Sequence, residues 1–151
     1  MQGNLANSYA ALGRIEQALS INREVYARRS ALYGKCHEST LGTAGNLASA
    51  LVDDLEQFDE AKVFLRDRIP EASRVLGNDH SITFRLQRMY AQSLYQNYRA
   101  SREDVTVAIA TLEDLDRRQT RIYGAAHPQT GSTRARLAEA RAILALAERK
   151  Y

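Results

Sequence analysis

A short motif, Gly-x-x-His-x-x-Thr, occurs three times in the chain and constrains its architecture more than any other feature. Its histidines are His37, His80 and His127, separated by 43 and then 47 residues, and the chain has no others. A nearly constant interval of this length is typical of a supersecondary unit stacked on copies of itself. Each unit of such an array contacts mainly its neighbours, and the stack presents an extended concave surface. The sequence therefore predicts a surface that holds another chain.

Apolar residues recur at intervals of three and four residues in every unit, as in Leu47, Leu51 and Leu55. This is the pattern of amphipathic helices, and no segment shows the strict alternation of a strand. The glycine of each motif follows an apolar residue, where a helix commonly ends in a residue with positive φ. The predicted helices span residues 2–12, 15–33, 39–54, 58–76, 82–99, 102–123 and 129–149.

The order of short motifs within each unit resembles the tetratricopeptide repeat (TPR), in the 42-residue form found in kinesin light chains. Asn-Leu-Ala comes first, at Asn4 and Asn46, an alanine precedes the glycine by 16 residues, and Gly-x-x-His-x-x-Thr closes the unit. The family's Pro after the histidine is present only at Pro128. The resemblance covers nearly the whole chain. It implies an all-α fold, a right-handed superhelix of antiparallel helix pairs (a TPR-like α-solenoid) with about seven helices.

A chain of 151 residues is long enough to bury a core of its own, and we expect a single TPR-like domain over residues 1–151. Two units depart from the regular repeat length. The second has one extra residue in the turn between its helices, and the third is longer still, through residues 97–102. The three repeats and the terminal capping helix are expected at about 1–42, 43–85, 86–131 and 132–151.

Two of the predicted helices carry specific expectations. Pro70 lies inside the helix at 58–76 and removes the hydrogen bond to the carbonyl of Arg66, so this helix should kink or break near 66–70. The helix at 129–149 should be polar on its outer side, as in a capping repeat. Residues expected to pack on the third unit are Leu137, Ile143 or Leu144, Ala138, Ala142 and Ala145. Residues expected in water are Glu139, Arg141, Glu148 and Arg149.

Charge and composition disfavour several classes of partner. The net charge is only +3, and the arginines near the tyrosines of the third unit fit a solvated helix face better than a nucleic-acid site. No run of about 18 apolar residues is present, so no membrane span is expected. The N-terminal segment lacks the features of a secretion signal. A single cysteine suits a reducing compartment, and we expect a cytoplasmic location.

The reactive side chains have simpler structural interpretations. One histidine per repeat does not converge on a zinc ion, and we expect the histidines to close the turns by hydrogen-bonding nearby backbone. The hydroxyl residues after them are expected to cap the next helix. Cys36 beside His37 lacks a third orienting group, which favours a loop thiol over a nucleophile. No phosphate-binding loop or hydrolase motif is present. We therefore expect no enzyme activity, metal or cofactor.

The resemblance implies that the first helix of each pair lines the concave side and the second forms the outer wall. Amide side chains on the concave side can hydrogen-bond an extended peptide, and arginines there favour an acidic segment. The expected function is a protein–protein interaction module, an adaptor or scaffold that binds a peptide segment of a partner in the groove. The predicted groove residues are Asn7, Ser49, Asp53, Arg85, Arg88, Gln92, Tyr95, Gln96 and Glu139.

Alternatives stay open at this point. Any of these side chains equally fits an ordinary polar surface, and the convex ridge near Arg28 and Arg117 also fits as the working surface. A second function class is a regulatory or structural segment of a larger signalling protein, packed on its own neighbouring domains. The partner and the oligomeric state do not follow from the sequence.

Overall fold

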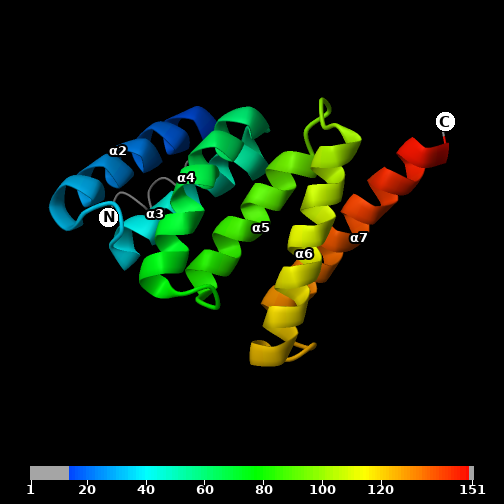
Figure 1. The fold of residues 1–151 in the computed structure, drawn as a ribbon. Helices are drawn as coiled ribbons and strands as arrows, with labels where there is room; N and C mark the ends of the chain where they lie inside the picture. The colour runs from blue at the N-terminus through cyan, green and yellow to red at the C-terminus, as the bar shows by residue number, and fades with distance from the viewer. Residues whose placement is uncertain (1–13, 150–151) are drawn as a thin grey trace. The chain divides into compact units, whose positions relative to one another are not determined.

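The structure is a computed structural model, and it describes residues 14–149. The chain divides into two compact units, Met1–Leu86 (unit 1) and Gln87–Tyr151 (unit 2). In the described part of the chain every regular element is helical (Figure 1). The elements are α2 (Ile15–Tyr33), α3 (Glu38–Ser49), the π-helical turn η1 (Ala50–Asp54), α4 (Phe58–Leu76), α5 (Ser81–Tyr95), α6 (Arg102–Tyr123) and α7 (Pro128–Arg149).

The predicted all-α fold is confirmed. Helices predicted at 15–33, 58–76 and 102–123 begin and end at the predicted residues, whereas the helix predicted at 2–12 lies outside the described residues. α5 ends at Tyr95, four residues before its predicted end. Asn97 explains the early end, because its Oδ1 accepts a hydrogen bond from the backbone N–H of Arg99 at 3.0 Å. Such local side-chain bonds compete with the helical backbone pattern.

A glycine ends the helix before each repeat motif. Gly34, Gly77 and Gly124 have the predicted positive φ angles, 89°, 99° and 89°, but their ψ angles of 159°, 157° and 160° lie outside the left-handed helical region. Residues with a Cβ rarely adopt these angles. The N–H of each glycine donates to the carbonyl four residues earlier, at 3.0–3.1 Å. The glycine therefore closes the last helical turn and redirects the chain in one step.

The histidine of each motif caps the helix that follows. Nδ1 of His37, His80 and His127 accepts a hydrogen bond from the backbone N–H two residues later, at 3.0, 3.1 and 3.1 Å. The prediction that the histidines close the turns is confirmed. The prediction that threonine hydroxyls cap these helices is wrong, because the threonine of each motif is buried and its hydroxyl has no hydrogen-bond partner.

In unit 1, α3 packs on both α2 and α4. Small and branched side chains fill the contact, since Leu41, Leu51 and Leu65 are completely or almost completely buried. Ala18 and Ala61, matched positions in the second helices of two repeats, are buried as well. Alanine at these positions lets the helix backbones approach closely.

α4 continues through Pro70, so the helix does not break near 66–70, and the kink that was the other expected outcome stays a prediction. Proline at this position removes one backbone hydrogen bond, the one to the carbonyl of Arg66. Leu65 and Ala72, which flank the proline, are fully buried. Their packing holds both halves of the helix in place despite the missing bond.

The extra residue of the second repeat lies in the π-helical turn η1. The N–H of Leu55 donates to the carbonyl of Ala50, five residues earlier, at 3.1 Å, and the N–H of Gln57 donates to the carbonyl of Leu51 at 2.8 Å. A π turn holds more residues than an α turn. The insertion predicted for the turn between the helices is therefore taken up at the end of the first helix.

In unit 2, α6 and α7 pack side by side (Figure 1). Leu112 and Leu115 of α6 are fully buried, and Leu137 of α7 is only 5% exposed. A buried hydrogen bond of 2.6 Å runs from the Thr133 hydroxyl to the side-chain oxygen of Gln119. This polar pair is satisfied inside the core, so it costs little to bury.

The buried stripe of α7 differs in part from the prediction. Leu137 is buried and Leu144 half-buried, as expected, and the charged residues predicted in water are exposed. Ala140, which was not predicted, completes the stripe. The helical period of 3.6 residues turns other predicted positions away from α6. Those exposed against prediction are Ala138, Ala142 and Ala145, whereas Leu144 meets the prediction that Ile143 or Leu144 would pack.

Candidate functional site

The predicted groove residues fall into two groups, one in each unit, and each group has its own geometry. Asn7 lies outside the described residues. The unit 1 group is Ser49, Asp53 and Arg85, and the unit 2 group is Arg88, Gln92, Tyr95, Gln96 and Glu139.

Arg85, at the start of α5, is the fixed cation of the unit 1 group. Its Nη1 donates to the side-chain oxygen of Asn46 on α3 at 3.1 Å. Gly45 makes room for it, because a Cβ at this position would lie 3.0 Å from Nη1. Burial lowers the pKa of Arg85, and the negative charge of Asp53 opposes that shift. The guanidinium is thus partly desolvated and held in one place.

Asp53 on η1 lies close enough for its negative charge to act on Arg85, and Asp54 follows it in the chain. The hydroxyl of Ser49 donates to Oδ2 of the exposed Asp53 at 3.1 Å. Burial, and secondarily the charge of Asp53, raise the pKa of Asp54. The structure therefore brings Ser49, Asp53 and Arg85 into one polar cluster with both a donor and an acceptor face.

The unit 2 group joins α5 to α7. The Tyr95 hydroxyl donates to Oε2 of Glu139 at 2.7 Å, and Nη1 of Arg136 donates to Oε1 of the same carboxylate at 3.0 Å. The side chain of Gln96 contacts the Tyr95 hydroxyl at 3.5 Å. Burial, followed by the bond to Glu139, raises the pKa of Tyr95.

Two members of this group are less accessible than predicted. Gln92 and Tyr95 are only 1% and 2% exposed, so they do not present an open surface. The physical reason is that the C-terminal half of α5 is buried on nearly every side, including Ala91 and Leu94. Arg88 and Gln96 are half-exposed and Glu139 is exposed, so a ligand can reach these side chains.

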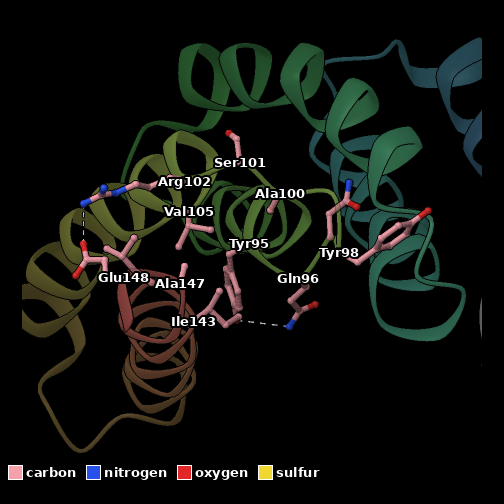
Figure 2. Close-up of a pocket in the computed structure, with 12 residues that line it drawn as sticks. Tyr95, Gln96, Tyr98, Ala100, Ser101, Arg102, Val105, Ile143, Ala147 and Glu148 are labelled. Carbon is pink, nitrogen blue, oxygen red and sulfur yellow. Dashed lines mark hydrogen bonds and ion pairs between the residues drawn. The ribbon is translucent and has the colours of Figure 1, made fainter. Parts of the chain in front are cut away.

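Unit 2 also contains a cavity of about 710 Å³ beside Tyr95 and Gln96 (Figure 2). The end of α5, the following loop, the first turns of α6 and the last turns of α7 line it, and it is open to solvent on one side. Val105, Ile143 and Ala147 contribute apolar walls. Figure 2 shows an ion pair along one side, where Nη2 of Arg102 lies 2.8 Å from Oε1 of Glu148.

Comparison with known proteins finds a family match over part of the chain. Residues 1–70, under half of the chain, match the tetratricopeptide repeat family. No curated protein matches the chain significantly over its sequence. In fold it is of the kinesin-light-chain-like TPR type.

Two solved structures show this TPR fold over most of the chain. A Podosopora anserina protein, described as a kinesin light chain with nearly identical TPR-like repeats, superposes with a TM-score of 0.78 at 24% identity, over 92% of this chain and 63% of that one. Its Q17M form gives 0.74 at 23% identity, over 98% and 67%. The TPR chain thus spans less than two thirds of the first structure's length.

Tetratricopeptide repeats generally mediate protein–protein interaction. Within residues 14–149, no three metal-binding side chains come together, and no helix is both long and apolar enough to cross a membrane. The described TPR surface therefore has the polar clusters and the cavity as its candidate sites.

The cavity was not predicted from the sequence. Several of its lining residues, including Tyr98 and Ala100, belong to the loop between α5 and α6 of the third TPR unit. The available signal was the longer interval, 47 against 43 residues, because excess length in one repeat is added to a loop. Side chains from α7, more than 40 positions away, complete the walls, and no local pattern links them to that loop.

Tyr95 allows a test of this TPR geometry in alkaline solution. Because the pKa of Tyr95 is raised on folding, the unfolded chain releases its phenol proton near pH 10 while the folded chain retains it. Its contribution to stability is complete below pH 10 and is lost as pH rises toward the raised folded value. The free energy of unfolding, measured by denaturant titration, should fall less steeply above pH 10 in Tyr95→Phe. Tyr98→Phe, at an exposed site, is the control, and coincident pH profiles for the two variants would contradict the assignment.

Proposed function

We propose that this TPR protein is an adaptor or scaffold module that binds a peptide segment of a partner protein on the surface of its first helices. The proposal includes a cytoplasmic location and no cofactor, nucleic acid or membrane. The observation that carries it is the preorganised guanidinium of Arg85, held over Gly45 by Asn46 on the first-helix side of a TPR unit.

The chemistry of Arg85 favours an acidic residue in the peptide. Guanidinium binds a carboxylate through two parallel, charge-assisted hydrogen bonds, and partial desolvation strengthens them. An incoming carboxylate would replace Asp53 as the charge partner of Arg85, because the exposed Asp53 side chain can turn into water. Arg88, three residues further along α5, supports the same preference.

A selected peptide tests this proposal without a known partner. Peptides enriched from a phage-displayed library on the intact chain should carry acidic residues. Their affinity, measured by fluorescence anisotropy, should fall at least tenfold in Arg85→Glu and rise in Asp53→Asn, which removes the competing carboxylate. It should also fall between about 0.1 and about 1 M salt, where the screening length shrinks from about 10 to about 3 Å.

Arg28→Glu is the matched control, because Arg28 is an exposed arginine on the outer helix α2 of the same unit. It should leave the affinity unchanged. If the selected peptides instead ignore Arg85→Glu and salt but lose affinity in Arg28→Glu, the binding surface is the convex ridge, and the proposal is wrong.

A further inference from the structure

The cavity of unit 2 exists because the third repeat is longer than the second. The interval between the motif histidines is 47 residues here and 43 in the preceding repeat. The connection between the first and second helices spans residues 96–101 in the third repeat and only 55–57 in the second. Residues of the longer connection form one wall of the cavity. The extra length of the third repeat therefore builds a pocket.

The pocket is apolar within and charge-neutral along its edge. Val105 is buried at its base, and Ile143 and Ala147 of α7 face it as apolar surface (Figure 2). Arg102 and Glu148 neutralise each other across α6 and α7. Because these two charges already pair with each other, they bind a charged ligand weakly. Burial of an apolar group against the apolar walls is favourable.

The loop that lines the pocket carries an exposed aromatic side chain. Tyr98 is 85% exposed, and its hydroxyl accepts a hydrogen bond from Nε of Arg99 at 3.1 Å. The Arg99 guanidinium carbon also lies 5.4 Å from the ring centroid. A large aromatic group held in water in this way is typical of residues that dominate binding energy at interfaces.

We propose that this pocket binds a large apolar side chain of a partner peptide. The inference rests on the proposed peptide-binding function. Gln96 connects the pocket to that function, because it lines the pocket, is half-exposed and is one of the predicted groove residues. A volume of about 710 Å³ lies within the usual range of ligand sites, about 300–1,000 Å³, and accommodates such a side chain with its adjoining backbone.

Small amino-acid analogues test the pocket directly. The intact chain is titrated with N-acetyl-L-leucinamide and N-acetyl-L-tryptophanamide while methyl NMR signals of Val105, Ile143 and Leu144 are followed. Both probes should produce saturable shifts at these methyls, and the charged analogue N-acetyl-L-glutamic acid amide should produce none. The chain contains no tryptophan, so the fluorescence of the indole probe gives an independent binding curve.

A matched pair of variants on α7 provides the control. Ala147 lines the pocket, whereas Ala142 is exposed on the same helix away from it. Ala147→Phe fills the pocket and should weaken both probes at least tenfold, and Ala142→Phe should leave them unchanged. If Ala147→Phe fails to fold, a second variant replaces it. Tyr98→Ala, at an exposed residue of the loop that lines the pocket, should then weaken binding of the indole probe. Absence of saturable shifts, or equal losses in both phenylalanine variants, would overturn the inference.

The selected peptides distinguish this inference from the proposed function. Affinity lost in both Arg85→Glu and Ala147→Phe supports both the proposed function and the pocket as a peptide site. Affinity lost only in Arg85→Glu leaves the proposed function standing and overturns the pocket as a peptide anchor. Affinity lost only in Ala147→Phe supports the pocket and overturns the role of Arg85.

Discussion

Replacing Leu112 with alanine should lower the free energy of unfolding by about 2–5 kcal/mol, the usual range for truncating a fully buried leucine. Leu112 lies on α6 with no exposed surface, where α6 packs on α7. The lost methyl groups leave a void, because close-packed helices relax only partly around it. Urea denaturation followed by circular dichroism measures the effect.

Leu146→Ala is the matched control for this change. Leu146 is the same residue type in the neighbouring helix but is 58% exposed. Its truncation should alter the free energy of unfolding by no more than about 0.5 kcal/mol. Similar losses in the two variants would show that α6 and α7 do not pack as described.

Alanine at Gly124 should lower the free energy of unfolding by about 1–3 kcal/mol, the cost of holding a residue with a Cβ in a glycine-only conformation. The backbone there has φ of 89°, and an added Cβ would meet nothing within 4 Å, so the cost is conformational and not steric. Thermal unfolding followed by circular dichroism should therefore show a clear fall in Tm.

At Gly131 the same substitution, glycine to alanine, should change the stability in the opposite direction. A Cβ there would also meet nothing within 4 Å, but Gly131 lies inside α7 at an ordinary helical φ. Gly131→Ala should raise stability by about 0.5–1 kcal/mol, because alanine loses less backbone entropy in a helix. If both substitutions change Tm in the same direction, the strained geometry assigned to Gly124 is wrong.

The sequence predicted the fold well because its signals are local and repeated. Helix ends at Gly34, Gly77 and Gly124 follow from one residue type in one conformation, and the histidine caps follow from the motif spacing. The predictions failed where side-chain packing outweighs a local backbone preference, or where the helical phase was assigned wrongly. Buried neighbours hold α4 together at Pro70, and a small phase error turned Ala138 away from α6.

The candidate site was predicted less well, because accessibility depends on what the rest of the unit covers. The sequence assigned Gln92 to an open groove, but α5 is buried around it. Asp53 and Arg85 were each predicted for the groove without reference to one another, and the structure brings them close enough for the charge of Asp53 to act on the guanidinium. The cavity depends on loop and α7 residues that are distant in sequence, and no periodic pattern encodes their meeting.

The π-helical turn η1 has a consequence for how such an array can vary over evolution. An inserted residue in an ordinary α-helix rotates every later side chain by about 100° and would expose the core face. Here Ala61, in the helix that follows the insertion, is as fully buried as Ala18 is in the preceding repeat, so the repeat absorbs the extra residue without exposing its core. Single-residue length changes can thus be silent, whereas the larger gain in the third repeat reshapes the surface. Insertion of one residue would then be neutral. Insertion of several residues would change the surface, and selection could act on a new binding site there.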